Sequence, residues 1–221
     1  FAVFRWFDSF HRFHCAAVEK TLQVFHNRHP GRGIQWDRIF RGKEDRFREG
    51  QLRIMTAGIL GSIHSPADVH ALSSQQLRDL CLEIRSTLLN YGRKHGGHIG
   101  SNLGVVELTV ALHRVFGSPR DRFVFDVSHQ SYVHKMLTGR AEAYLDESRF
   151  GEVTGFTNPL ESEHDSFVLG HTGTSISLAC GLAKTRDMQH TAAGASEIGN
   201  VIAIIGEIGR ASCRERVSSP V

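Results

Sequence analysis

Apolar residues recur at helical spacing in the middle of the chain. Between residues 74 and 91 they stand three and four positions apart, which is typical of an amphipathic helix; they are Leu77, Leu80, Cys81, Ile84 and Leu88. Ser73 and Gln76 have the spacing of a capping box at the start of this helix. A more uniformly apolar stretch at 105–116 predicts a second, buried helix that ends at the glycine and proline following it.

Three short apolar runs predict strands at 122–127, 166–169 and 200–206. The last run is rich in β-branched residues and is typical of a central parallel strand. Further helices are expected at 132–137 and 175–188, between these runs. Strands that alternate with helices predict an α/β domain with a doubly wound, mostly parallel sheet.

Glycine-rich or small-polar turns lie next to these elements, and each carries a histidine. The stretch 96–104 holds four glycines and His98, and two further turns hold His129 and His171. In an open α/β sheet, ligands bind at the strand ends, where helix N-termini favour anions. We expect the three turns to meet and to serve proton transfer beside a phosphorylated ligand. The alternative for each histidine is a purely structural role in a turn.

Composition excludes several classes of function. A formal net charge of +3 does not by itself indicate a nucleic-acid partner. The cysteines are scattered, without a Cys-x-x-Cys pair, so that neither a zinc site nor a disulfide framework is indicated; they are Cys15, Cys81, Cys180 and Cys213. Without an apolar run of membrane-spanning length or a signal-peptide pattern, we expect a soluble, cytoplasmic protein with no membrane partner.

The first 54 residues differ from the rest because they are basic and aromatic. One interpretation is a basic arm with stacking positions for RNA or single-stranded DNA. Another is a metal site at His11, His14 and Cys15. The interpretation we favour is that residues 1–54 are a non-native or disordered extension, since Met55 would make a natural start.

Long blocks of the chain resemble the N-terminal region of the 1-deoxy-D-xylulose-5-phosphate synthase family, within the transketolase-like thiamine diphosphate enzymes. The resemblance covers about residues 58–206, and its blocks are 96–113, 126–132, 134–135, 137–140 and 170–175. It implies a partial thiamine diphosphate-binding domain, on the diphosphate side, at 55–206. An alternative within the same class is a transketolase-type N-terminal subunit that acts with a partner chain.

The resemblance also implies a reaction and a set of site residues. Thiamine diphosphate, with Mg²⁺, would support condensation of pyruvate with glyceraldehyde 3-phosphate and loss of CO₂, in a homodimer that feeds isoprenoid and thiamine biosynthesis. His98 and His129 would be catalytic, and His129, Gly170, His171 and Thr172 would bind the cofactor. No metal ligand is assigned.

The chain departs from the family pattern at a few positions. Ser128 stands where glycine is usual and Val133 where proline is usual. After Gly206, the family's metal-binding Gly-Asp-Gly is absent and Glu207 follows instead. Residues 207–221 resemble the translation of a sequencing-adapter oligonucleotide, and we expect them to be an artefactual tail. The given chain is therefore expected to be inactive by itself.

Overall fold

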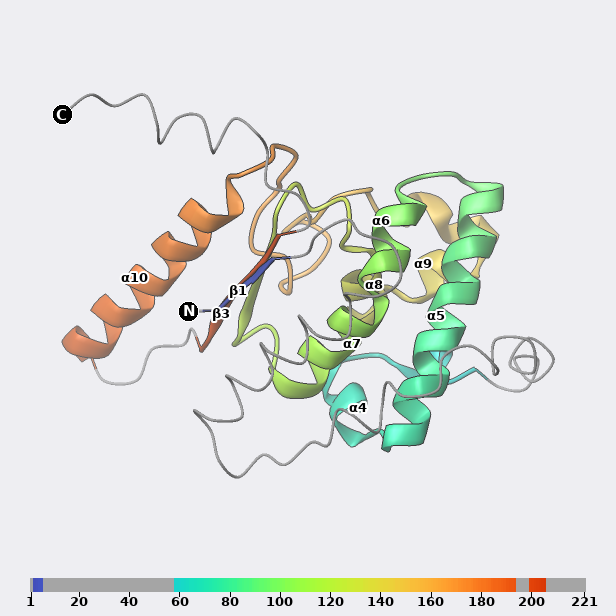
Figure 1. The fold of residues 1–221 in the computed structure, drawn as a ribbon, viewed down its shortest axis with the longest axis horizontal. Coiled ribbons are helices and arrows are strands. Elements are labelled where there is room, and N and C mark those ends of the chain that lie inside the picture. The colour runs from blue at the N-terminus through green and yellow to red at the C-terminus, as the bar shows by residue number, and fades with distance from the viewer. Residues whose placement is uncertain (1, 6–57, 194–198, 206–221) are drawn as a thin grey trace.

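The computed structural model describes residues 2–5, 58–193 and 199–205 (Figure 1). The expectations for most of 1–54, including the basic arm and the His11–Cys15 metal site, lie outside the described residues. So does the expectation for the tail at 207–221. Within the described residues, no helix is both long and apolar enough to cross a bilayer.

Three parallel strands form the sheet of the described chain. They are β1 (Ala2–Arg5), β2 (Arg122–Phe125) and β3 (Val201–Ile205), in the order β1-β3-β2. β3 is central: Ile202 lies opposite Ala2 on one side and Phe123 on the other. The strands predicted at 122–127 and 200–206 are confirmed, and so is the parallel direction of the sheet.

Helices cover both faces of this sheet (Figure 1). Side chains alternate along a strand, so neighbouring residues face opposite layers. One face packs against α7 (Val106–Val115) through Phe123, Phe125, Ile202 and Ile204, together with Leu108, Leu112 and Phe116. The other packs against α10 (Ser175–Ala193) through Val124, Val201 and Ala203, together with Ala179. Burial on both faces explains why β3 is an unbroken apolar run.

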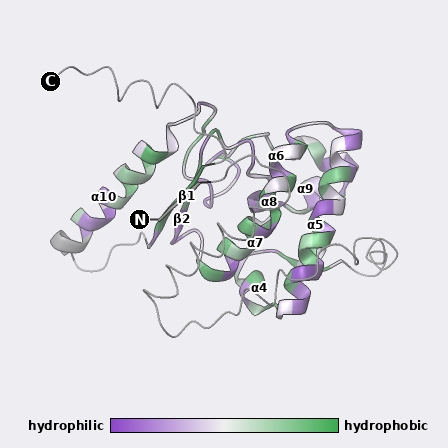
Figure 2. Cartoon of the chain, in the orientation of Figure 1, coloured by the Kyte–Doolittle hydropathy of each residue, from purple (hydrophilic) through white to green (hydrophobic). Residues whose placement is uncertain are grey.

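The second layer of helices is built around α5 (Ser74–Lys94), which lies beyond α7 from the sheet (Figure 1). Its buried residues follow the predicted spacing and are Leu77, Leu80, Ile84, Thr87, Leu88 and Tyr91. Ser73 and Gln76 form the predicted capping box, in which Gln76 N donates to Ser73 Oγ at 3.3 Å. Figure 2 shows both hydrophobic and hydrophilic residues along this helix, as its position at the edge of the core requires.

Shorter elements complete the helical layer. They are α4 (Pro66–Ala71), α6 (Ile99–Gly104), α8 (Tyr132–Lys135) and α9 (Glu142–Leu145), with short non-α helical segments at Leu60–Ser62, Met136–Arg140 and Glu147–Glu152. The turn after α8 closes at Gly139, where φ is +88° and an added Cβ would lie 2.8 Å from the His64 carbonyl oxygen. Glycine is required there by both its conformation and its space.

Two local predictions are wrong. The sequence predicts a turn over 96–104, but its last six residues form α6. The stretch 166–169 is extended but belongs to no strand. Its carbonyl groups bond to side chains instead of a neighbouring strand: Phe167 O accepts from Thr157 Oγ1 at 2.7 Å and Leu169 O accepts from Ser128 Oγ at 3.1 Å.

Candidate functional site

The chain makes a sharp turn at the carboxyl end of β2, and this turn carries His129. Val127 and Ser128 have φ angles of +60° and +70°, a region that residues other than glycine rarely adopt. The buried Ser128 hydroxyl donates to Leu169 O and accepts from Thr157 N, both at 3.1 Å. These two bonds connect the turn with the segments that follow it and offset part of the backbone strain.

Asn102 of α6 links this turn with the one that carries His98. Its Nδ2 donates to the carbonyl oxygens of His98, at 2.7 Å, and His129, at 2.8 Å. Its Oδ1 accepts from Tyr132 N, at the start of α8, at 2.8 Å. Asn102 is fully buried, so that one amide group fixes three segments of the chain relative to one another.

The rings of His98 and His129 lie edge to face, with their centroids 5.2 Å apart and their planes at 73°. Phe156 lies beside the His98 ring, at 5.7 Å. His98 is exposed and His129 is half-buried. Imidazole is the side chain best suited to exchange protons near neutral pH, so this pair is a candidate for proton transfer.

Tyr132 contacts the backbone of the His98 turn. Its phenolic oxygen accepts from His98 N at 3.3 Å. Gly97 has a φ of +102°, and an added Cβ would lie only 2.8 Å from the same oxygen. A side chain at residue 97 would therefore strain the backbone and displace either the tyrosine or the histidine turn.

Asp126 at the end of β2 holds the turn that precedes α10. Gly173 N donates to both carboxylate oxygens at 2.9 Å, and Ser175 N donates to one of them at 3.2 Å. A carboxylate at a helix N-terminus is favoured by the helix dipole. The sequence suggested that free N–H groups here would hold phosphate, but these two bond to the protein's own Asp126.

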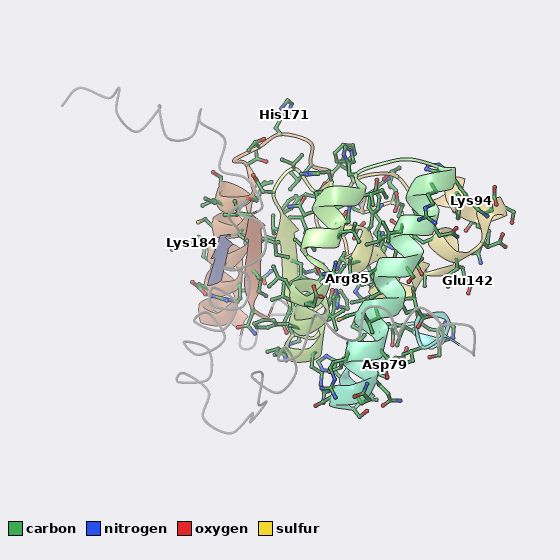
Figure 3. The ribbon with its side chains drawn as sticks, turned by 45° about the vertical axis from the view of Figure 1, so that its right-hand side comes forward. Asp79, Arg85, Lys94, Glu142, His171 and Lys184 are labelled. Carbon is green, nitrogen blue, oxygen red and sulfur yellow. The ribbon has the colours of Figure 1, made fainter. Side chains whose placement is uncertain are left out.

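The third predicted turn lies at the same end of the sheet, because Asp126 ties it to β2. Its Gly170, His171 and Thr172 are exposed. Figure 3 shows the His171 side chain extending away from the ribbon, toward solvent. The structure thus brings His98 and His129 together, and it leaves His171 on an exposed turn with its ring directed outward.

A buried polar network joins α8 to α7 and to Asp165. His134 Nε2 lies 3.2 Å from Asp165 Oδ1, and its Nδ1 lies 2.9 Å from His113 Nε2. Arg140 donates two hydrogen bonds to Asp165, at 2.8 and 2.9 Å. Burial raises the pKa of Asp165, but the hydrogen bonds from Arg140 and His134 outweigh it and hold that pKa well below its usual value.

The ionised Asp165 fixes the tautomers of both histidines. His134 Nε2 donates to the carboxylate, and in the neutral ring Nδ1 is then the atom that accepts from His113 Nε2. Burial favours this neutral form in both rings. Burial lowers the pKa of His113 well below its usual value, and burial also lowers that of His134 although Asp165 opposes the effect.

Lys135 joins α8 to the segment at 154–161. Its Nζ donates to Glu161 Oε2 at 2.6 Å and to Thr154 O at 2.8 Å, and its side chain is fully buried. Burial lowers the pKa of Lys135, while the bond to Glu161 opposes that shift. This segment includes Phe156, so the buried ion pair helps to hold the aromatic ring beside His98.

Some buried polar atoms near the turn after β2 bond to no protein group within the described residues. They are Gln130 Oε1, Ser131 Oγ and Ser175 Oγ. Such atoms are suited to bind a polar ligand, because leaving them without a partner is costly. The described ranges contain no group of three or more His, Cys, Asp or Glu side chains arranged to hold a metal ion.

Sequence reasoning missed the residues that position the two histidines. Asn102 lies within the glycine-rich stretch 96–104 and Asp126 within the predicted strand 122–127, and neither was assigned a role. An amide within a glycine turn and a carboxylate at a strand end are both recognisable signals. Apart from His98, the partners of these two side chains are 27 to 49 positions away in the sequence, so only the fold reveals what they bind.

The family model described as 1-deoxy-D-xylulose-5-phosphate synthase matches residues 60–212. Proteins with that name are similar to this chain. That of Acidobacterium capsulatum is 52% identical over 149 residues, which are 67% of this chain and 23% of the relative. That of Chlamydia trachomatis is 56% identical over 131 residues, 59% of this chain and 20% of the relative. That of Dictyoglomus thermophilum is 46% identical over 149 residues. The chain therefore spans about a quarter of the length of these relatives.

Proposed function

The chain belongs to the 1-deoxy-D-xylulose-5-phosphate synthase family, and from that premise we propose that it contributes the His98–His129 site to such a synthase. The reaction would join pyruvate to glyceraldehyde 3-phosphate, with loss of CO₂, to give 1-deoxy-D-xylulose 5-phosphate. Because the chain spans about a quarter of its relatives' length, the proposal concerns a protein of their full length, acting as a homodimer and supplying isoprenoid and thiamine biosynthesis.

The observation that carries the proposal is the approach of His98 and His129. Their ring centroids lie 5.2 Å apart beyond the carboxyl end of β2, where ligands bind in open α/β sheets. A reaction that removes and returns protons at a carbonyl compound needs such groups on either side of the reacting atom. In this proposal, His98 moves a proton at the substrate and His129 contacts the reacting carbon centre.

The cofactor of the proposed reaction is thiamine diphosphate, which supplies a stabilised carbanion when bound. The residues present fit a polar cofactor, since Gln130, Ser131 and Ser175 offer buried oxygen atoms that bond to no protein group within the described residues. His129 and the turn at 170–172 would line the site. Mg²⁺ is proposed as well, but the described residues provide no ligand cluster for it.

The proposal is tested in a chimera. Residues 58–205 replace the matching region of the Acidobacterium capsulatum synthase, which is 52% identical over 149 residues. With thiamine diphosphate and Mg²⁺ added, we expect formation of 1-deoxy-D-xylulose 5-phosphate from pyruvate and glyceraldehyde 3-phosphate. His98→Asn and His129→Asn in the chimera are each expected to lower kcat by about 100-fold, the scale of one general acid–base group.

Two controls make the result decisive. His95→Asn changes an exposed histidine at the end of α5 and should leave kcat unchanged. The isolated 221-residue chain should give no turnover. A folded chimera that binds the cofactor yet forms no product would contradict the proposal, and exchange between ketose and aldose phosphates would favour a transketolase-type subunit instead.

A further inference from the structure

Among residues 58–193, the side chain of Asn102 bonds to both histidine turns and to the start of α8. Its side-chain nitrogen donates to His98 O and His129 O, and its oxygen accepts from Tyr132 N, all within 2.7–2.8 Å. Those distances are typical of strong, well-aligned hydrogen bonds. The side chain is fully buried, so water does not compete for these bonds.

The three partners also fix the orientation of the amide. Two of them are carbonyl oxygens, which accept only, and the third is a backbone N–H, which donates only. Rotating the amide by 180° would place its oxygen against two carbonyl oxygens and its NH₂ against an N–H. Both donors and the acceptor are used, and only asparagine among residues of this size offers that combination.

We propose that Asn102 is a positioning residue that sets the separation of the His98 and His129 rings. Each bond from Nδ2 ends on the backbone carbonyl oxygen of a histidine, so it fixes the backbone that carries the imidazole ring. His98 O has further donors, from Ser101 Oγ at 3.0 Å and Asn102 N at 3.4 Å, so the His98 turn keeps its own shape when Nδ2 is removed. Removing Nδ2 instead frees the His98 turn to move relative to the His129 turn.

This inference rests on the proposed function only for the chemical use of the two rings; the positioning is measurable without cofactor or substrate. The probe is the nuclear Overhauser effect between ring protons of His98 and His129, recorded on the isotopically labelled 221-residue chain. The structure supplies an internal reference, because the buried rings of His113 and His134 stack with centroids 5.1 Å apart and Asn102 bonds to neither of them.

The test substitution is Asn102→Asp. It preserves the size of the side chain and the acceptor for Tyr132 N, but it replaces the donor by an oxygen facing two carbonyl groups. We expect the His98–His129 effect to fall at least five-fold while the His113–His134 effect persists. Asn102→Ala removes all three bonds without adding charge and should give the same pattern.

Two matched variants separate positioning from general destabilisation. Asn90→Asp makes the same chemical change at an exposed site on α5 and should leave both effects unchanged. Leu77→Ala removes a buried side chain at the far end of α5 and should lower Tm without loss of the His98–His129 effect.

Three results would overturn the proposal. One is a His98–His129 effect that persists in Asn102→Asp and Asn102→Ala, and another is its loss in Leu77→Ala. The third is simultaneous loss of both ring effects in the two Asn102 variants, which would make Asn102 a residue of general folding. An inactive chimera would contradict the proposed function and leave these ring measurements unaffected.

Discussion

Some residues in this protein have strained backbone conformations and make hydrogen bonds to segments far away in the sequence. Ser128 is the clearest case, since its φ of +70° costs about 1 kcal/mol for a residue with a Cβ. The family resemblance of the chain predicts glycine at residue 128, and the positive φ there explains that preference. The serine instead gains two hydrogen bonds, to Leu169 O and from Thr157 N, that glycine cannot make.

The buried histidines predict how stability depends on pH. Burial lowers the pKa of His113 and His134, and it lowers the pKa of His164 to about 4. In the unfolded chain these rings take up protons near pH 6.5. Below that pH the unfolded state binds more protons than the folded state, so the free energy of unfolding falls as the solution is acidified, by about 1.4 kcal/mol per pH unit for each histidine.

The groups around these rings support that sign. His113 faces His134, His164 and His70, all of which lower its pKa, while Asp165 opposes the lowering at His134 without reversing it. Urea unfolding at pH 7.5, 6.5 and 5.5 measures the slope. His113→Gln should reduce it by one histidine's share and the exposed His64→Gln should not; a stability that is flat between pH 7.5 and 5.5 would contradict the prediction.

At the scale of elements, ion pairs of very different burial join the helices to the segments around them. Lys135 of α8 and Glu161 lie 2.6 Å apart, with side chains only 0% and 11% exposed. Lys94 of α5 and Glu147 also lie 2.6 Å apart, but they are 45% and 65% exposed. Distance alone would rank these pairs as equal, whereas solvent screening separates them.

Lys135→Met is expected to lower the free energy of unfolding by about 3 kcal/mol, because it leaves Glu161 without its main cationic partner in a partly buried site. Arg140, 3.2 Å from the same carboxylate, keeps the loss from being larger. The matched Lys94→Met should cost less than about 1 kcal/mol. Chemical denaturation at pH 7 measures both, and equal losses in the two variants would refute the distinction.

The sequence predicted the long elements because their signals are local. The apolar spacing of α5, the capping box at Ser73 and the apolar run of β3 each specify their own structure. α6 was missed because its glycines favour a loop, and burial of Asn102 overrides that preference. The extended 166–169 segment was mistaken for a strand because its bonding partners, Ser128 and Thr157, cannot be inferred from its own residues.

The sequence also predicted only part of the candidate site. Histidines in turns beside strand ends identified His98 and His129, and the structure brings those two rings together. It leaves His171 exposed on a turn whose following N–H groups, at Gly173 and Ser175, bond to Asp126. Which turns meet depends on the path between them, and the periodicity of a sequence does not encode that path.

For the whole molecule, the central sheet is where the layers of the described chain meet. β3 pairs on both sides, and all five of its residues are buried. α7 covers one face and α10 the other. The candidate site residues lie at one end of the sheet, in turns that are exposed or half-buried.

Hydrogen exchange should reproduce that gradient. Amides of β3 and β2 open only with the sheet, so we expect them to exchange at least about 100-fold more slowly than those at 170–172. Mass spectrometry of peptides from the native chain measures the ratio. Comparable rates in the two regions would show that the sheet is not the most stable part of the molecule.

The pairing of β2 with β3 also bears on the order in which the chain folds. Seventy-nine positions separate Arg122 from its partner Val201, and closing so long a loop carries an entropic cost before any contact is gained. The α4, α5 and α7 layer draws on nearer neighbours, so we expect it to form the early nucleus. Asp126 and His129 lie at the start of that long loop, while Asn102 lies in α6, between α5 and α7 in the sequence. The bonds from Asn102 to His129 O and Tyr132 N span only 27 and 30 positions, so we expect the two histidine turns to meet before the last strand docks and the reactive site to precede the finished sheet.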